Sequence, residues 1–207
     1  VLSALCYPPG STPIAMDLQV PLAAARVEPA APTASAAPTP PVAKIAHTVR
    51  YPLTVPALPA PEQKLAARRS LNLPLNVPLI GNAGWLIPRK RFDVFLETAA
   101  KISRRFPQAR FVIAGDGPER IRLEALAKQL QLTDKITWTG WISQMEQFHQ
   151  SLDVLLFNSD WDAMGLTPLE AAAQGVPVVA SVINGGLKEI ISSPEWGILL
   201  DRHEPER

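Results

Sequence analysis

Two acidic residues flank a glycine in the segment that joins a predicted strand to a predicted helix. Asp162 and Glu170 lie on either side of Gly165, and glycine lets the backbone approach a ligand closely. Residues 152–157 have the apolar run of a buried strand, and residues 167–174 are typical of a helix. The first N–H groups of a helix have no carbonyl partner and lie at its positive end, so they suit a phosphate. We therefore predict an anion site here, at the carboxyl end of a strand, where open α/β sheets bind ligands.

Each carboxylate also has a purely structural interpretation. Thr167 and Glu170 have the spacing of a capping box, with Pro168 at the first helical position, in which Glu170 accepts a hydrogen bond from the Thr167 N–H. Alternatively, the two oxygens of Glu170 accept hydrogen bonds from two adjacent ribose hydroxyls. Asp162 is either a turn-forming acid in a loop or a ligand contact. The spacing alone leaves these alternatives open.

Strands and helices alternate along most of the chain. The predicted strands cover residues 75–84, 110–114, 135–139, 152–157, 176–181 and 197–200. The predicted helices cover residues 91–106, 118–130, 143–150, 167–174 and 186–192. Continuous apolar strands that alternate with helices are typical of a parallel sheet covered on both faces. The sequence therefore predicts an α/β domain over residues 75–207, with a Rossmann-like, doubly wound parallel sheet of about six strands.

Proline separates the first part of the chain from this domain. Thirteen of the 22 prolines lie in residues 1–61, and residues 28–41 have low complexity. Because proline removes a hydrogen-bond donor and breaks periodicity, we expect residues 1–42 to be disordered or extended. Residues 43–74 are expected to hold a lead-in strand and a connecting segment. The chain lacks an initiator Met, which suggests a fragment.

Composition argues against several classes of protein. The 20 basic and 19 acidic residues nearly balance, which is not typical of a nucleic-acid binder. A single cysteine excludes an intrachain disulfide framework, the three histidines are scattered, and no metal site is expected. No run approaches the roughly 18 apolar residues of a membrane span. The Gly115-Asp116-Gly117 turn lacks the third glycine of a nicotinamide site, because Arg120 stands there, and we expect Asp116 to cap the next helix instead.

Residues 66 to 200 or so resemble the donor-binding domain of retaining glycosyltransferases of the GT-B fold, family 4. The resemblance is carried by an acid and a glutamate with seven residues between them, followed by a small-residue helix, glycine and Pro-Val-Val. Further matching segments are Gly84-Trp85-Leu86 with Lys90, Phe111 to Pro118, Ile136 to Gly140, and Asn184 to Glu189. The resemblance implies transfer of a hexose from a nucleoside-diphosphate sugar with retention of configuration, with no cofactor and no metal at the donor.

The resemblance also implies roles for single residues. Glu170 would hold the ribose, and Asp162 would be the catalytic-site acid that faces the donor sugar. Trp141, in the loop beside the nucleobase, either stacks on the base or covers the core. The diphosphate would be bound by Lys90 and by backbone N–H groups of the loop Met164, Gly165, Leu166 and Thr167.

Two positions depart from the family pattern. Asp162 stands where the family usually has Glu, and Trp85 stands where it usually has Arg. Arg89 or Arg91 could supply the missing cation. These departures favour the alternative hypothesis, a non-catalytic nucleotide-binding or scaffold module with the same fold.

The resemblance further implies a partner domain outside this chain. An N-terminal Rossmann-like domain would bind the acceptor, a glycan or lipid-linked glycan used in polysaccharide or glycoconjugate biosynthesis. This fragment alone is therefore expected to be inactive. The whole enzyme is expected to be cytoplasmic, with peripheral association at the inner face of the membrane through that second domain.

Overall fold

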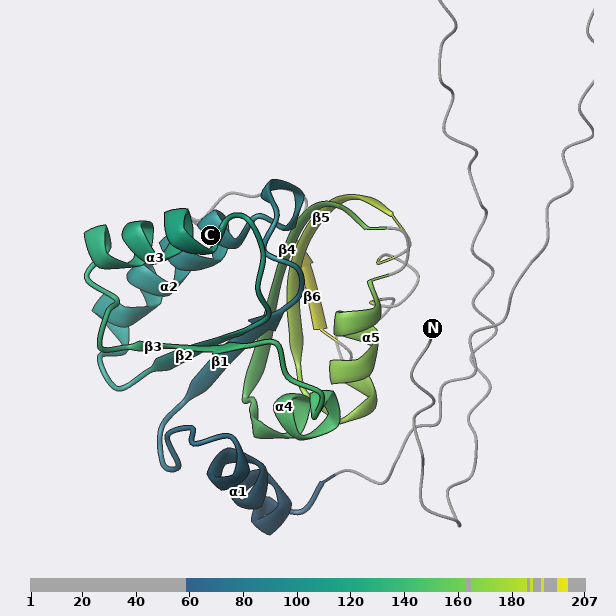
Figure 1. Cartoon of the computed structure of the whole chain (residues 1–207). Helices are drawn as coiled ribbons and strands as arrows, with labels where there is room; N and C mark the ends of the chain where they lie inside the picture. The colour runs from purple at the N-terminus through teal and green to yellow at the C-terminus, as the bar shows by residue number, and fades with distance from the viewer. Residues whose placement is uncertain (1–58, 163–164, 186, 188–190, 192–196, 201–207) are drawn as a thin grey trace, which may run out of the picture.

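The computed structural model describes residues 59–162, 165–185, 187, 191 and 197–200 (Figure 1). The expected disordered segment, the lead-in strand, Met164 and most of the helix expected over residues 186–192 lie outside this range. In the described part, no helix is both long enough and apolar enough to cross a bilayer.

A six-stranded sheet forms the centre of the domain, and every strand pairing in it is parallel. The strand order is β3-β2-β1-β4-β5-β6. The strands are β1 (Leu79–Ala83), β2 (Arg110–Ala114), β3 (Ile136–Gly140), β4 (Val154–Asp162), β5 (Val178–Gly185) and β6 (Gly197–Leu200). This order confirms the predicted doubly wound sheet. It reverses between β1 and β4, and ligands bind such sheets outside the carboxyl ends of the strands at the point of reversal.

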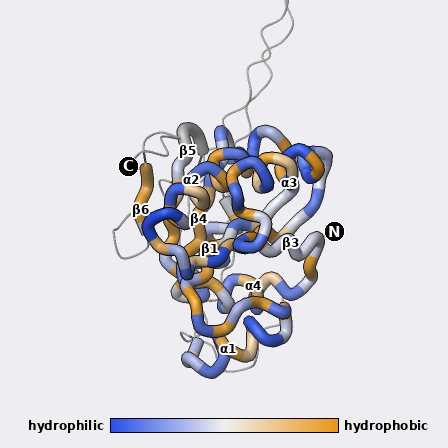
Figure 2. The backbone as a smooth tube through the Cα atoms, turned by 90° about the vertical axis from the view of Figure 1, so that its left-hand side faces the viewer, coloured by the Kyte–Doolittle hydropathy of each residue, from blue (hydrophilic) through white to orange (hydrophobic). Residues whose placement is uncertain are grey.

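Helices cover both faces of the sheet (Figure 1). They are α1 (Pro61–Ser70), α2 (Phe92–Arg105), α3 (Arg120–Gln129), α4 (Met145–Ser151) and α5 (Leu166–Ala173), with a short 3₁₀ turn η1 (Pro88–Lys90). Neighbouring strand residues point to opposite faces. Leu79 accordingly packs with Phe148 of α4 and Leu169 of α5, whereas Ile80 packs with Phe95 of α2 and Leu123 of α3. Figure 2 shows hydrophobic and hydrophilic stretches alternating along α2 and α3, as expected for helices with one buried side.

Strand β4 is longer than the predicted strand over residues 152–157. Its polar end stays paired with β5, with Trp161 opposite Asn184 and Asp162 opposite Gly185. Asp162 therefore stands at the end of a strand rather than in a free loop.

Helix α1 lies in the stretch expected to be a connecting segment, yet it packs on the domain. The Arg68 side chain is its anchor, with only 4% of its surface exposed. Its guanidinium donates hydrogen bonds to the carbonyls of Ser151 (2.8 Å), Leu75 (2.7 Å) and Val77 (2.9 Å), and to Asp153 Oδ2 (2.7 Å). The folded unit therefore includes α1.

Candidate functional site

The carboxyl ends of β1 and β4 meet the start of α5 at the reversal in strand order. Strand β1 ends at Ala83 and β4 ends at Asp162, and α5 begins at Leu166. The Thr167 hydroxyl lies 3.4 Å from the Ala83 carbonyl oxygen and links the first turn of α5 to the end of β1. The elements that the sequence placed around the candidate site thus converge on one edge of the sheet.

Lys90 and Asp162 form an ion pair at this edge. The Lys90 ammonium contacts Asp162 Oδ2, and each of the two side chains is only 18% exposed. The ammonium also lies 5.5 Å from the centre of the Phe157 ring. The Ser159 hydroxyl lies 2.9 Å from the Trp161 carbonyl oxygen and 3.3 Å from the Arg89 carbonyl oxygen, so it brings η1 and β4 together. An anionic ligand would therefore meet a half-buried cation, but it would compete with Asp162 for that cation.

The two arginines beside Lys90 have other partners. The Arg89 guanidinium lies 5.1 Å from the centre of the Trp161 ring, within cation–π range. Arg91 contacts Asp93 and Asp160, each at 3.1 Å. The hydrogen bond to Asp93, followed by the one to Asp160, raises the pKa of Arg91 against the opposing effect of burial. Arg91 is thus committed to neighbouring carboxylates.

Gly165 begins α5 in a conformation that glycine favours. It is the N-cap residue, with φ +73°, and no side chain caps the helix there. A Cβ added at this position would lie 3.1 Å from Leu187 Cδ1. The following N–H groups, of Leu166 and Thr167, have no intrahelical acceptor, and Pro168 has no N–H. A capping box would require Thr167 at the N-cap, but Gly165 is the N-cap and Pro168 is the third helical residue rather than the first.

Gly165→Ala is expected to destabilise the domain more than Gly140→Ala does. Gly140 has a similar φ of +68°, but a Cβ added there meets nothing within 4 Å. Backbone strain alone should cost Gly140→Ala about 1–2 kcal/mol. The contact with Leu187 should add to that cost in Gly165→Ala. Urea denaturation of both variants measures the difference, and equal losses would contradict the tight contact at the start of α5.

Glu170 does not form the capping box. The helix begins earlier than predicted, so Glu170 lies in the second turn, and its Oε2 is 3.3 Å from His149 Nε2. The Glu170 side chain is 28% exposed, whereas that of His149 is 1% exposed. His149 is a residue that the sequence analysis left unassigned. Nothing in local spacing points to it, because the partner is on another helix.

Three exposed tryptophans lie at or just after the carboxyl ends of three strands. Trp141 after β3 is 67% exposed, so the alternative that it covers the core is wrong, and its indole is open to stacking. Trp85 after β1 is 55% exposed, and Trp161 in β4 is 48% exposed.

The turn after β2 packs against the segment after β1. The Leu86 N–H donates to the Asp116 carbonyl at 2.9 Å, and the Glu119 N–H donates to the Leu86 carbonyl at 3.0 Å. Glu119 is the N-cap residue of α3, and the Asp116 carboxylate accepts only the N–H of Gly117, at 2.7 Å, among the described contacts. The expectation that Asp116 caps this helix is therefore wrong.

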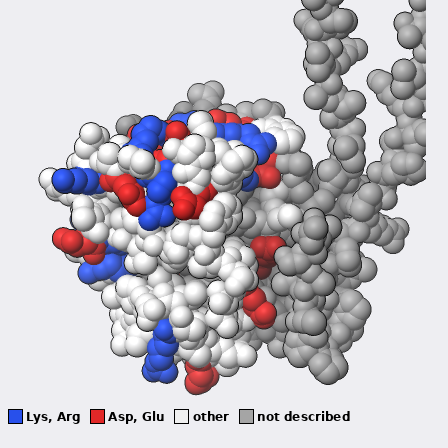
Figure 3. All heavy atoms as spheres, viewed as in Figure 1, with Lys and Arg blue, Asp and Glu red and all other residues white. Residues whose placement is uncertain are grey.

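Charged side chains of both signs are mixed over the upper part of the face shown in Figure 3. Among the described residues, no group of three histidines, cysteines or acids is placed to hold a metal ion.

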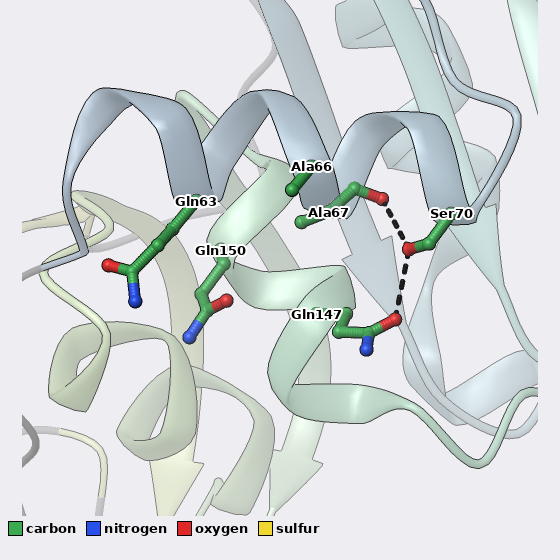
Figure 4. Close-up of a pocket in the computed structure, with 6 residues that line it drawn as sticks. All are labelled: Gln63, Ala66, Ala67, Ser70, Gln147 and Gln150. Atoms are coloured by element: carbon green, nitrogen blue, oxygen red, sulfur yellow. Dashed lines mark hydrogen bonds between the residues drawn. The ribbon is translucent and has the colours of Figure 1, made fainter.

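A cavity of about 280 Å³ lies between α1 and α4 (Figure 4). Ser70 and Gln147 meet at one end of it, where the Ser70 hydroxyl lies 2.9 Å from Gln147 Oε1. Its lining residues carry no formal charge; they are Gln63, Ala66, Ala67, Ser70, Gln147 and Gln150.

Comparison with known proteins decides the family. Residues 63–207 match the family model described as glycosyl transferases group 1. The chain belongs to this family. It is 33% identical over 147 residues to the uncharacterized glycosyltransferase MJ1607 of Methanocaldococcus jannaschii, an alignment that covers 70% of this chain and 37% of that protein. The chain therefore spans well under half the length of this relative.

Two solved structures agree on the fold. Anabaena Alr3699/HepE in complex with UDP and glucose has a TM-score of 0.64 at 23% identity, over 72% of this chain and 40% of that one. The C-terminal domain of the group 1 glycosyl transferase LpcC from Francisella tularensis has a TM-score of 0.61 at 26% identity, over 72% of this chain and 79% of that one. The resemblance to the C-terminal domain of a GT-B glycosyltransferase is thereby confirmed.

Proposed function

We propose that this group 1 domain binds a nucleoside-diphosphate hexose, with UDP as the first candidate nucleotide, and serves its transfer with retention of configuration. The observation that carries the proposal is that a largely buried cation, Lys90, and the uncapped start of α5 both lie at the edge of the sheet where the strand order reverses. The Anabaena relative in complex with UDP and glucose supports the choice of nucleotide and sugar.

Each part of the donor would meet a different part of this edge. The two oxygens of Glu170 would accept the ribose hydroxyls, and the exposed Trp141 would stack on the base. Asp162 would face the sugar. The diphosphate would be bound by Lys90 and the backbone of Met164, Gly165, Leu166 and Thr167.

The chemistry is displacement at the anomeric carbon. The bond from that carbon to the diphosphate oxygen breaks, and the nucleoside diphosphate leaves with the electron pair. The acceptor hydroxyl oxygen forms the new bond on the same face of the sugar, and its proton passes to the departing diphosphate oxygen. Lys90 and the N–H groups of α5 would stabilise the charge that develops on the leaving oxygen. In this proposal Lys90 and the N–H groups of α5 stabilise the leaving diphosphate, so the transfer uses no metal ion and no cofactor.

The remaining functions would belong to a partner domain. That domain would bind the glycan or lipid-linked glycan acceptor and would hold the enzyme at the inner, cytoplasmic face of a membrane. Without it, this chain would bind donor but complete no transfer.

The second candidate function is a nucleotide-binding or scaffold module without catalysis. The contact between Asp162 and Lys90 favours it, because both groups already satisfy each other. Trp85, in place of the usual arginine, also lowers the positive charge available to a diphosphate.

Glu170→Ala is expected to lower the affinity for UDP by about 10- to 100-fold, the loss expected from one or two hydrogen bonds to a charged acceptor. Stability should fall by about 1–3 kcal/mol, because the substitution leaves the buried His149 ring without its hydrogen-bond partner, although no helix cap is lost. Isothermal titration calorimetry with UDP, GDP and ADP, followed by thermal melting, measures both quantities. Glu97→Ala, at an exposed position on α2, is the matched control.

Two outcomes would contradict the proposal. If the folded chain binds none of the three nucleotides, there is no donor site and the proposal fails. Alternatively, Glu170→Ala could reduce stability and leave UDP affinity intact, which would support the scaffold module.

A further inference from the structure

His149 is a buried polar residue with one satisfied and one unsatisfied ring nitrogen. Its Nε2 lies 3.3 Å from Glu170 Oε2. Its Nδ1 is fully buried and has no hydrogen-bond partner among the described residues. The ring packs edge-on against Phe148, with the centroids 5.6 Å apart and the planes at 70°. The imidazole is therefore held in place by the core, with a single polar contact.

The surroundings select one form of the ring. A hydrogen on Nδ1 would be a buried donor without an acceptor, which is costly. A hydrogen on Nε2 points toward a carboxylate, which in its ionised form can only accept. The tautomer with its hydrogen on Nε2 satisfies both constraints, and in this tautomer His149 donates to Glu170.

The contact is not explained by local structure. Glu170 does not cap α5, and more than a quarter of its side chain remains exposed. A free glutamate side chain loses considerable rotamer entropy when a ligand orders it. Because the buried His149 ring already holds one oxygen of Glu170, part of this rotamer entropy is lost on folding, and less of it is lost when the ligand binds.

We propose that His149 is a positioning residue that orients the Glu170 carboxylate toward the ribose hydroxyls of the nucleotide. The inference rests on the proposed function, because it assumes that Glu170 contacts a ribose. Each carboxylate oxygen has two acceptor sites, so the bond from His149 leaves room for both hydroxyls. His149 itself touches neither the ribose nor the reacting atoms.

The test compares two substitutions at this position. His149→Phe keeps a ring and removes both nitrogens, whereas His149→Gln places an amide N–H near the position of Nε2. The two ligands are UDP and 2′,3′-dideoxyuridine diphosphate, which lacks the ribose hydroxyls. Calorimetry on the whole chain measures the affinities. Gln147→Ala, at an exposed position on the same helix, is the control.

His149→Phe is expected to lower UDP affinity about tenfold and to leave dideoxyuridine diphosphate affinity unchanged. His149→Gln should restore UDP affinity to within about threefold of wild type. In the background of Glu170→Gln, the His149→Phe substitution should add no further loss, because both changes remove one interaction.

Each contrary result has its own meaning. If the wild-type chain binds no nucleotide, the proposed function fails. If it binds UDP and Glu170→Gln weakens binding while His149→Phe does not, the positioning role is overturned. Equal losses for both ligands in His149→Phe would also overturn it, since they would indicate a general disturbance of the core.

A measurement on the wild-type chain covers the case in which His149→Phe does not fold. Two-bond ¹H–¹⁵N spectra of the histidine rings report which nitrogen carries the hydrogen, with the signals assigned by their loss in His149→Gln. The Nε2–H form is expected, with resonances that shift on addition of UDP but not of the dideoxy analogue. The Nδ1–H form, or equal shifts with both ligands, would overturn the inference.

Discussion

Arg68→Met is expected to lower the free energy of unfolding by about 3–5 kcal/mol, because three backbone carbonyls lose a charged donor at a cost of about 1–3 kcal/mol each. Methionine fills a similar space but leaves Asp153 without its buried partner. It also leaves the carbonyls of Ser151, Leu75 and Val77 without the donors they now have. Urea denaturation at neutral pH measures the loss.

Arg69→Met is the matched control, because Arg69 is the next residue on α1 and is exposed. It should change stability by no more than about 0.5 kcal/mol. A small effect of Arg68→Met would show that α1 is not part of the cooperative unit. The midpoint of urea denaturation would then measure the unfolding of the sheet and the other helices only.

The same substitution should change the acid sensitivity of the domain. Burial acts to raise the pKa of Asp153, but hydrogen bonds from Lys64, the Leu79 N–H and Arg68 together lower it below its ordinary 3.8. The ionised carboxylate therefore stabilises the fold above the unfolded-state pKa, and this contribution is lost as the pH falls through the lower folded-state pKa. In Arg68→Met the folded-state pKa rises toward the ordinary value, so stability should fall less steeply on the acid side.

The sheet could be predicted because apolar runs and their alternation with helices are local signals. Residues 110–114, for example, form β2 with the predicted bounds. The true end of β4 could not be predicted, since the polar residues 158–162 belong to the strand only through pairing with β5. Helix α1 was missed for a similar reason. Its buried residues are Ala67 and Arg68, and an arginine becomes a core anchor only when distant carbonyls and a carboxylate surround it.

The candidate site was predictable in its location but not in its contacts. Topology places Lys90 and Asp162 at the same edge of the sheet although they are 72 residues apart. The ion pair between them depends on the directions of the two side chains, which the spacing of the residues in the sequence does not predict. Glu170 is the opposite case, because one of the two interpretations of its spacing, the capping box, places its partner three residues away. The helix begins at Leu166, and the contact is with His149 on α4 instead.

Lys90→Ala is expected to lower the affinity for UDP by about 10- to 100-fold, because a charge-assisted hydrogen bond to a phosphate contributes about 1.5–3 kcal/mol. Affinity for uridine, which has no phosphate, should not change. Lys128→Ala removes an exposed lysine of α3 and controls for net charge. The loss should also shrink at high salt, to the extent that the site is open to screening. Calorimetry with UDP and uridine at two salt concentrations tests these expectations.

Asp162→Asn separates the two roles that the contact with Lys90 allows. If the carboxylate competes with the diphosphate for the ammonium, its removal frees Lys90, and UDP should bind a few-fold more tightly than to wild type. If Asp162 also faces the hexose, the same variant should lose part of the preference for UDP-glucose over UDP. We expect both effects together, because the carboxylate must release Lys90 to reach the sugar. An unchanged affinity for both ligands would show that Asp162 neither restrains the cation nor contacts the donor, and the scaffold hypothesis would then account better for the site.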